Sequence, residues 1–214
     1  MKVFLANIGY HTRVFPLVTP PMGVMSLAAY LRRELSVEPM IVNQRLENCL
    51  PEEVVRRAAA FGADVVGFST LTTSSYLLHE VVRLTRAALP KALILAGGPH
   101  ASSAREAVMG EADVDVVVPG EGELATKAVL RAWTEGGRDF GGIPGLIWRD
   151  ANREVVVNPG PVEQVEDLDA LPMPAYDLID LPAYWRAQSI APVFRRRYAS
   201  LNSSRGCPYG CIWC

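Results

Sequence analysis

Three cysteines close together in sequence form the densest group of potential metal ligands in the chain. Cys207, Cys211 and Cys214 are spaced C-x3-C-x2-C, and the fourth cysteine, Cys49, is far away in sequence. Three thiols cannot all pair with one another in disulfides, and thiolates are preferred ligands of iron–sulfur clusters and of zinc. The spacing therefore predicts a soft-metal site.

The number of local thiols favours a cluster over zinc. A structural zinc site usually has four protein ligands, whereas this loop supplies three and has no fourth candidate nearby. Three thiolates on a cubane iron–sulfur cluster leave one iron open to another ligand. A cysteine group without any metal is the remaining alternative.

A second set of polar and glycine residues follows the predicted strands. Ser69, Thr70 and Thr72 follow one apolar run, Gly97-Gly98-Pro99-His100 follows the next, and Gly120-Glu121-Gly122 follows a third. Ligands of open parallel sheets bind beyond the carboxyl ends of the strands, and glycines, hydroxyls and helix N-termini suit close contact with a ligand. The set predicts a site for a large, flat, polar-rimmed cofactor, although glycines that simply end strands and helices would give the same pattern.

The histidines and acids give weaker signals. His100 is the histidine favoured to face a ligand, because it follows two glycines and a proline at a strand end. His11 is interpreted as a solvated loop residue and His79 as a structural or exposed helix residue. Glu121 and Glu123 open a helix, where the helix dipole alone explains acids.

Short apolar runs alternate with segments of helical period over the first 136 residues. Strands are expected at Lys2–Ile8, Met40–Val42, Asp64–Thr70, Ala92–Ala96 and Val114–Val118. Helices are expected at 22–35, 51–61, Ser75–Leu89, Ser102–Met109 and from about Glu123 to Trp133. This alternation predicts an α/β domain over residues 1–136, a flavodoxin-like or Rossmann-like doubly wound sheet of five parallel strands.

The pattern changes after residue 136. Gly145–Arg149 and Glu154–Asn158 flank a turn composition and predict a β-hairpin, and residues 159–183 have the proline-rich composition of a linker. Hairpin and linker make up the second predicted segment, 137–190. The third, 191–214, contains a predicted strand at Tyr198–Ser203 that leads into the cysteine loop.

Composition excludes several classes of protein. The formal net charge of −2 gives no sign of a nucleic-acid partner, and no apolar run approaches the roughly 20 residues of a membrane helix. The few cysteines and the lack of an apparent secretion signal predict a reducing cytoplasm.

The ordered motifs resemble one protein family. The cysteine loop, with Trp213 before its last cysteine, resembles the cluster loop of radical S-adenosylmethionine (radical SAM) enzymes. The first ~135 residues resemble the cobalamin-binding domain that precedes the catalytic barrel in one branch of that superfamily. The matching features are Pro20-Pro21-Met22-Gly23, Gly97-Gly98-Pro99-His100, Gly120-Glu121-Gly122-Glu123 and the linker Asp167–Pro174.

The resemblance implies three cofactors. Cys207, Cys211 and Cys214 would bind a [4Fe–4S] cluster whose open iron is chelated by S-adenosylmethionine, with Tyr209 and Trp213 near the adenine. Cleavage of S-adenosylmethionine would give a 5′-deoxyadenosyl radical, and cobalamin would carry a methyl group or tune the radical step. The implied cobalamin-binding residues are Pro21, Gly23, Ser69, Thr70, Thr72, Gly97, Gly98, His100, Gly120, Glu121 and Gly122.

Two departures from the family pattern qualify these expectations. Many cobalamin domains carry D-x-H-x-x-G after the first strand, but Gly9–Val14 lacks the Asp and the Gly. Cobalamin is therefore expected to bind without a protein histidine. A catalytic barrel needs roughly 200 residues or more, so the chain is expected to be a truncated or N-terminal piece without turnover.

The leading hypothesis is a cobalamin-dependent radical SAM enzyme that transfers a methyl group to an unactivated centre. The full-length enzyme would need a small-molecule substrate and an external electron donor. One competing hypothesis is a non-catalytic cobalamin- or small-ligand-binding module with a vestigial cysteine tail. Another keeps the family fold but has lost cobalamin.

Overall fold

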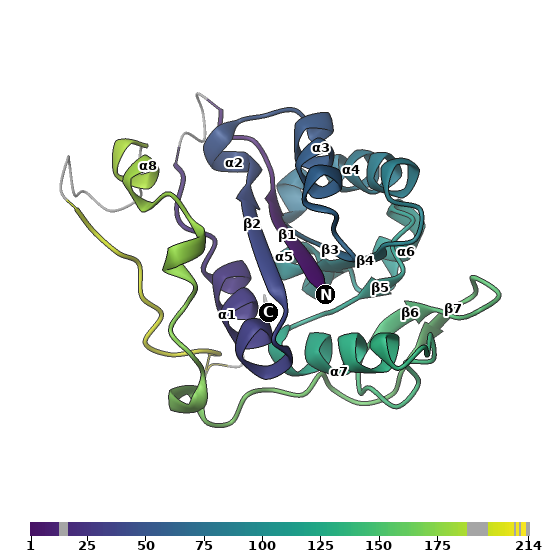
Figure 1. Cartoon of the computed structure of the whole chain (residues 1–214). Helices are drawn as coiled ribbons and strands as arrows, with labels where there is room; N and C mark the ends of the chain where they lie inside the picture. The colour runs from purple at the N-terminus through teal and green to yellow at the C-terminus, as the bar shows by residue number, and fades with distance from the viewer. Residues whose placement is uncertain (13–16, 188–196, 208, 210, 213–214) are drawn as a thin grey trace.

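A single mixed β-sheet forms the centre of the molecule, and helices cover both of its faces (Figure 1). The computed structural model describes residues 1–12, 17–187, 197–207, 209 and 211–212. In this part of the chain the sheet has seven strands in the order β2-β1-β3-β4-β5-β6-β7. They are β1 (Lys2–Ile8), β2 (Glu38–Asn43), β3 (Val65–Thr70), β4 (Leu93–Gly97), β5 (Val116–Val117), β6 (Ile147–Arg149) and β7 (Val155–Val157).

The first five strands are all parallel to one another. Their spatial order, β2-β1-β3-β4-β5, is the flavodoxin-like order expected from the sequence. This order reverses direction between β1 and β3, and the carboxyl ends of these strands are where a doubly wound sheet binds its ligand.

The expected count of five strands for the sheet is wrong. The predicted hairpin forms, and β6 pairs antiparallel with β5 while β7 pairs antiparallel with β6. The hairpin therefore extends the same sheet, which has seven strands. Its attachment depends on contacts between chain segments that are about 30 residues apart, and local sequence patterns do not report such contacts.

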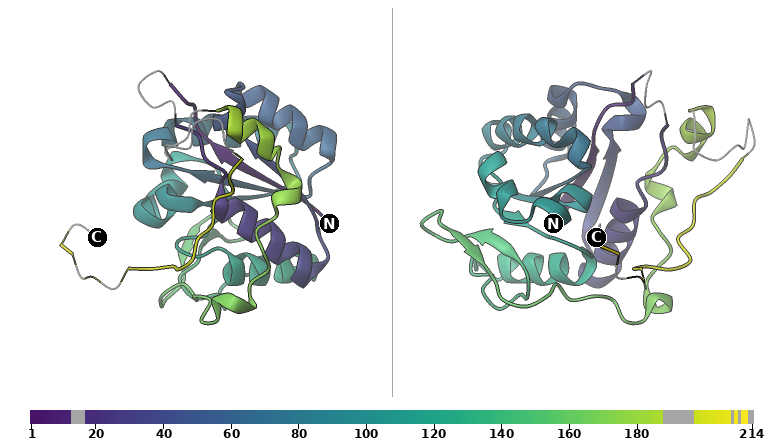
Figure 2. Two further views of the ribbon diagram at one scale, coloured as in Figure 1. Left: turned by 90° about the vertical axis from the view of Figure 1, so that its left-hand side faces the viewer. Right: turned by 180° about the vertical axis from the view of Figure 1, so that it is seen from behind.

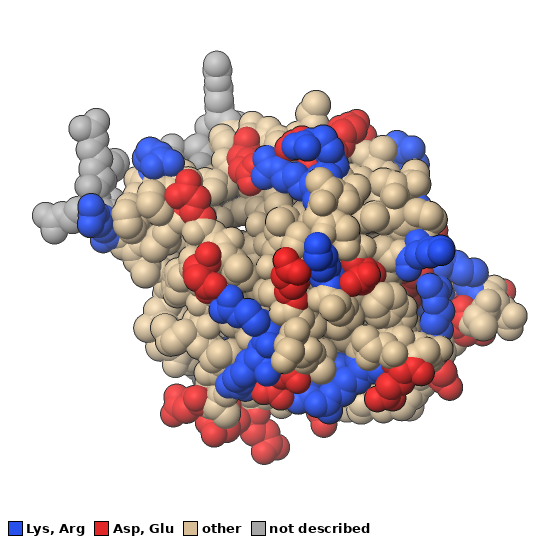
Figure 3. Space-filling model, in the orientation of Figure 1, with Lys and Arg blue, Asp and Glu red and all other residues tan. Residues whose placement is uncertain are grey.

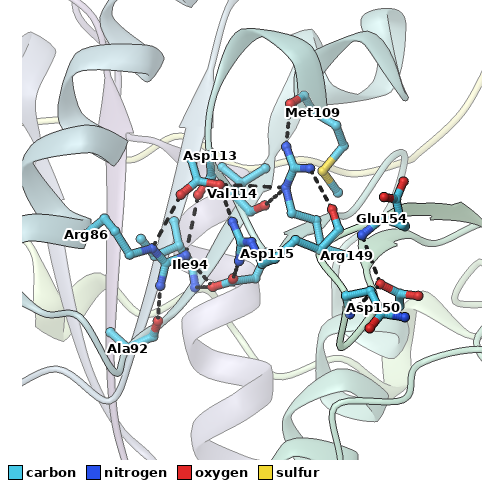
Figure 4. A network of polar contacts seen from close by, with 12 residues as sticks. Arg86, Ala92, Ile94, Met109, Asp113, Val114, Asp115, Arg149, Asp150 and Glu154 are labelled. Carbon is cyan, nitrogen blue, oxygen red and sulfur yellow. Dashed lines mark hydrogen bonds and ion pairs between the residues drawn. The ribbon is translucent and has the colours of Figure 1, made fainter.

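Ion pairs to one buried aspartate hold the hairpin to the parallel strands (Figure 4). Asp115, which precedes β5 and is buried, accepts hydrogen bonds from Arg86 Nη2 and Arg153 Nη1, each at 2.8 Å, and from the backbone N–H of Ile94 at 2.9 Å. Arg149 Nη2 donates to the Met109 carbonyl at 2.6 Å. Because a buried carboxylate is costly without partners, this network fixes the position of the hairpin.

The helices form two groups, and each group covers one face of the sheet. The helices are α1 (Met22–Leu35), α2 (Gln44–Glu47), α3 (Pro51–Phe61), α4 (Ser75–Ala88), α5 (Gly98–Ala104), α6 (Ala107–Glu111), α7 (Glu123–Thr134) and α8 (Leu181–Arg186). Side chains of α1 and α7 pack with one core cluster, and side chains of α3, α4, α5 and α6 pack with the other. Along β3, alternate residues enter the two clusters, as the period of two requires.

The helix expected at Ser102–Met109 is replaced by two shorter helices. α5 begins earlier, at Gly98, directly after β4, and α6 begins at Ala107. The break lies at Arg105, which has φ 50° and ψ −120° and cannot continue a helix. The sequence has neither Gly nor Pro at this point, so the break has no local signal.

The segment after the hairpin runs back along the body to α8, and the cysteine-bearing segment then returns beside it (Figure 2). Trp185 Nε1 donates to the Tyr198 carbonyl at 2.7 Å, and the Tyr176 hydroxyl donates to the Ser200 carbonyl. The strand expected at Tyr198–Ser203 does not form, and this segment pairs with neither edge strand of the sheet, β2 or β7. α8 is a six-residue helix without a strong periodic pattern, and the sequence did not predict it.

The surface carries mixed charge. On the face drawn in Figure 3, basic and acidic side chains are intermixed and separated by uncharged surface, in keeping with the net charge of −2. Among the residues that the structure describes, no helix has the length and apolar character needed to cross a bilayer.

Candidate functional site

A cavity of about 250 Å³ lies at the carboxyl ends of β3, β4 and β5, in the layer of α1 and α7. Its wall comes from the sheet, from both helices, from the loop before α7 and from the cysteine-bearing segment. Its lining residues are Leu5, Gly23, Val24, Ser26, Leu27, Gly67, Phe68, Ser69, Leu95, Ala96, Gly97, Gly98, Val118, Gly120, Glu121, Gly122, Glu123, Thr126, Asn202 and Arg205.

The floor of the cavity is open because the central strand lacks a side chain there. Gly67 of β3 lies between Leu5 of β1 and Leu95 of β4 in the parallel register. Leu5 and Leu95 point to the α1/α7 face, so Gly67 faces the same side. A Cβ at position 67 would approach Leu5 Cδ2 within 2.7 Å. The missing side chain of Gly67 therefore leaves room for Leu5, and both residues line the floor of the cavity.

Two adjacent glycines shape the next wall in different ways. Gly97 has an extended backbone, with φ −142°, and an added Cβ would meet only the Val118 carbonyl oxygen, at 3.7 Å. Gly98 has φ +84°, and an added Cβ would clash with Ser69 Oγ and lie 3.3 Å from the Thr70 nitrogen. Gly97 thus borders open space, whereas Gly98 is needed for the turn from β4 into α5.

An arginine from the cysteine-bearing segment closes the rim. Arg205 Nη2 lies 2.6 Å from Glu123 Oε1, and Arg205 Nη1 lies 3.2 Å from Glu121 Oε2. The hydrogen bond to Glu123 is the main reason that the pKa of Arg205 is raised, and burial of the side chain opposes it. Glu123 is only 3% exposed, so the guanidinium neutralises a carboxylate that would otherwise be buried alone.

Three helix N-termini meet at this rim. α1 begins beside Gly23, α5 begins at Gly98, and α7 begins at Glu123. Helix N-termini carry partial positive charge and free N–H groups. The rim can therefore accept an anionic or carbonyl-rich part of a ligand, while the floor of Leu5, Leu95 and Val118 accepts an apolar part.

The structure brings seven of the predicted cobalamin-site residues together in the cavity wall. They are Gly23, Ser69, Gly97, Gly98, Gly120, Glu121 and Gly122. Pro21, Thr70, Thr72 and His100 are outside the wall of this cavity. Ser69 and Thr70 separate because neighbouring residues of a strand point to opposite faces, and Thr70 is buried on the α5 side.

His100 is turned away from the cavity, contrary to the expectation that it faces a ligand there. It is 3% exposed, its Nε2 lies 2.7 Å from Glu111 Oε2, and its Nδ1 lies 3.4 Å from Thr72 Oγ1. The short helix α5 packs on the other core cluster, in which Ala101 is buried. His100 therefore links α5 to α6.

His11 also lies outside the cavity wall. Its Nδ1 is 2.7 Å from the Arg45 carbonyl oxygen, beyond the end of β2. Since a carbonyl only accepts, the ring donates its Nδ1–H there. Cobalamin binding without a protein histidine stays a prediction.

The predicted cluster ligands are only partly within the described residues. Cys207 and Cys211 are exposed and form no disulfide, and Tyr209 is also exposed. Cys214 and Trp213 lie outside the described residues. The structure thus keeps two thiols accessible, and the three-cysteine site stays a prediction.

Several wall residues were missed in the sequence. Gly67 stands inside an apolar strand, and a glycine at such a position is a usable signal for a close approach or a hollow. Ser26, Leu27 and Thr126 read as ordinary residues of amphipathic helices, and Asn202 and Arg205 are far from the sheet in sequence. No local pattern identifies these residues.

Comparison with known proteins assigns a family to this arrangement. A family model described as a B12 binding domain matches residues 11–130, more than half of the chain. An uncharacterized methyltransferase from Pyrococcus horikoshii is 30% identical over 203 residues, covering 94% of this chain and 42% of that protein. The cobalamin-dependent radical SAM methyltransferase TokK from Streptomyces tokunonensis is 30% identical over 160 residues, covering 71% of this chain and 22% of TokK.

Solved structures share the fold. OxsB, a cobalamin-dependent S-adenosylmethionine radical enzyme solved with aqua-cobalamin and S-adenosylmethionine, superposes with a TM-score of 0.71 at 19% identity, over 83% of this chain and 24% of OxsB. The radical S-adenosylmethionine methyltransferase TsrM from Kitasatospora setae gives a TM-score of 0.61 at 20% identity, over 74% of this chain and 30% of TsrM.

The doubly wound sheet with its cavity at the strand ends is an α/β fold that the chain shares with OxsB and TsrM. The chain belongs to the B12-binding domain family. Its homologues and structural neighbours include cobalamin-dependent radical SAM methyltransferases, and the chain spans less than half the length of each of those compared above.

Proposed function

We propose that this chain is the cobalamin-binding and cluster-loop part of a cobalamin-dependent radical SAM enzyme that transfers a methyl group to an unactivated centre. The observation that carries the proposal is the wall of the cavity. It combines the B12-binding region with Asn202 and Arg205, the residues that lead into the cysteine loop.

The cavity fits part of cobalamin. Its volume of about 250 Å³ lies just below the roughly 300–1,000 Å³ of sites that enclose drug-sized ligands. It is too small for the corrin ring and admits one flat aromatic group, such as the benzimidazole at the end of the nucleotide arm. The apolar floor suits that group, and the helix N-termini at the rim suit the phosphate beside it.

The glycines at the rim fit the larger part of the cofactor. Gly23 has no atom within 4 Å of an added Cβ, and at Gly97 only a carbonyl oxygen comes that close. Backbone without side chains lets a broad, flat macrocycle approach the ends of the strands. Ser69 at the end of β3 can donate a hydrogen bond to one of its peripheral amides.

The cysteine segment fits an iron–sulfur cluster. The accessible, unpaired thiols of Cys207 and Cys211 are soft ligands, with Cys214 proposed as the third. When bound, the cluster would supply the electron that cleaves S-adenosylmethionine, and cobalamin would carry the methyl group.

Partners and location follow from the same chemistry. We propose a small-molecule substrate and an external electron donor for the full-length enzyme, with neither nucleic acid nor membrane as partner. Exposed thiols that bind a cluster need a reducing compartment, and the cytoplasm is the proposed location.

The test is retention of the cofactor. The purified chain is incubated with hydroxocobalamin and desalted, and its visible spectrum is recorded. Stoichiometric corrinoid absorbance is expected, and Arg32→Gln, which changes an ion pair of α1 outside the cavity wall, is expected to retain the same amount. A spectrum without corrinoid bands would reject the proposal.

A further inference from the structure

Arg205 and Glu121 together join three segments that are far apart in sequence. The guanidinium of Arg205 bonds Glu123 at the start of α7 and Glu121 in the loop before it. Glu121 Oε2 also accepts a hydrogen bond from the backbone N–H of Val165, at 3.0 Å. The rim of the cavity, the linker and the cysteine-bearing segment thus meet at Glu121, which bonds both Val165 and Arg205.

The contact with Glu123 is the strong part of this junction. The Glu123 side chain is 4% exposed and the Arg205 side chain 23%, and their atoms lie 2.6 Å apart. A charge-assisted hydrogen bond away from water is stronger than a surface ion pair, and removing one partner leaves a buried charge alone. The segment is therefore held at the rim by an interaction that water replaces poorly.

Arg205 lies two residues before Cys207. Two residues of extended chain span at most ~7 Å, so the junction keeps the first cysteine of the loop next to the rim. Asn202 and Arg205 line the cavity themselves. A molecule bound in the cavity therefore touches the segment that carries the cysteines.

We propose that Arg205 is a positioning residue that fixes the segment 202–207 on the cavity rim, so that cobalamin binding and the order of this segment reinforce each other. The coupling to cobalamin rests on the proposed function. The fixing of the segment by Glu121 and Glu123 does not depend on it.

The sign of the coupling follows from where the guanidinium lies. With both ion pairs formed, the cavity is still open, so Arg205 forms part of the wall and does not fill the space. A ligand in the cavity gains contact with a wall that is already in place. By thermodynamic linkage, docking of the segment raises the affinity for the ligand, and binding of the ligand raises the equilibrium constant for docking by the same factor.

The experiment measures the mobility of residue 207. Cys49, Cys211 and Cys214 are replaced by Ser, and a nitroxide label is attached to Cys207. Its electron paramagnetic resonance spectrum is recorded with and without hydroxocobalamin in this background, with Arg205→Gln and with Arg32→Gln. Arg32 is the control, because it joins α1 to Asp177 of the linker by an ion pair of the same length, with Nη1 and Oδ2 2.6 Å apart, that is exposed and lies outside the cavity wall.

We expect hydroxocobalamin to slow the motion of the label in the chain with the three Cys→Ser changes, and equally when Arg32→Gln is added to it. In Arg205→Gln the label is expected to be more mobile in both conditions, with cobalamin bound roughly tenfold more weakly. Glu123→Gln combined with Arg205→Gln avoids an unpaired buried charge and checks folding. Because the two residues act together, the double variant is expected to bind cobalamin no more weakly than Arg205→Gln alone.

Three outcomes separate the two proposals. Equal label mobility and equal cobalamin affinity in the background and in Arg205→Gln overturn this inference while leaving the proposed function in place. If the background binds no cobalamin, the proposed function and the coupling both fail. In that case the label mobility without ligand still tests whether Arg205 fixes the segment on the rim. Equal mobility in the background and in Arg205→Gln overturns this claim, and greater mobility in Arg205→Gln supports it.

Discussion

At the scale of single residues, glycine stands at positions 97 and 98, at the end of β4, for two different physical reasons. Gly98 has a backbone conformation that L-residues avoid, and it touches Ser69. Gly97 has an ordinary extended backbone and faces the cavity. We therefore expect Gly97 to be dispensable for folding although it borders the site, and Gly98 to be needed for folding.

Gly97→Val is expected to block the cavity without weakening the fold. The extended φ of residue 97 suits a β-branched side chain, and its Cβ would meet only one atom within 4 Å. We expect retention of hydroxocobalamin to fall at least about tenfold, with the midpoint of thermal unfolding almost unchanged. Unaltered retention at an unchanged midpoint would contradict the assignment of this cavity.

Gly98→Ala is the matched comparison and is expected to act on stability. The positive φ and the clash with Ser69 Oγ should cost about 1–3 kcal/mol in the free energy of unfolding. Denaturation by urea measures this loss. A second change, Ser69→Gly, removes the clashing oxygen and is expected to restore part of the stability; no recovery would show that backbone strain alone is responsible.

At the scale of elements, one buried tyrosine of α8 forms a hydrogen bond with the last residue of β2. The Tyr184 side chain is 1% exposed, and its hydroxyl accepts a hydrogen bond from Asn43 Nδ2 at 3.0 Å. Burial raises the pKa of Tyr184 from 10.0 to about 12, and the bond from Asn43 opposes the shift. α8 therefore depends on this hydroxyl being neutral.

The raised pKa predicts a loss of stability in alkali. Because the folded chain binds this proton more tightly than the unfolded chain, the contribution is complete below about pH 10 and is lost as the pH rises through 12. The loss is on the order of 2 kcal/mol. We expect the free energy of unfolding of the wild type to exceed that of Tyr184→Phe at pH 7 by about 1 kcal/mol, the value of the Asn43 bond.

Urea unfolding at pH 7, 10 and 11.5 checks this expectation. Since the loss on the order of 2 kcal/mol exceeds the advantage of about 1 kcal/mol at pH 7, the wild type should become less stable than Tyr184→Phe between pH 10 and 11.5. Tyr209→Phe changes a tyrosine that is 76% exposed, and it should follow the wild type at every pH. A difference for Tyr184→Phe that stays constant with pH would show that its hydroxyl does not ionise in this range.

At the scale of the whole molecule, the two proposed cofactor sites use different stretches of the chain. The cavity wall is mostly contributed by residues 5–126, and the thiols lie after residue 206. Only the segment with Asn202 and Arg205 belongs to both. Loss of one cofactor should therefore leave the other largely in place.

Cys207→Ala is expected to lower the iron content and leave cobalamin bound. After anaerobic reconstitution with iron and sulfide, a chain with two remaining thiols in the loop should hold a small fraction of the wild-type iron. Hydroxocobalamin should be retained as in the wild type, since Cys207 is not part of the cavity wall. Unchanged iron in Cys207→Ala would remove the cysteines from the set of ligands.

The sequence by itself determined the layout of the parallel half of the molecule. The run Lys2–Ile8 and the helix 22–35 have the same bounds in the structure. The spacing of apolar residues and the residues that end a strand or a helix are local features of the sequence, so they can be read without knowledge of the fold. The strand ends with Ser69, Gly97 and Gly120 also identified the edge of the sheet where the cavity lies.

The tertiary structure alone decided which of these residues meet. It joined the hairpin to β5, turned His100 toward Glu111, opened a hollow over Gly67 and brought Arg205 to Glu123. Each of these outcomes depends on which residues of separate segments become neighbours once the sheet is formed. The cavity has this origin: its floor lies between leucines of two other strands, and its rim is closed by an arginine 82 residues from its partner in sequence.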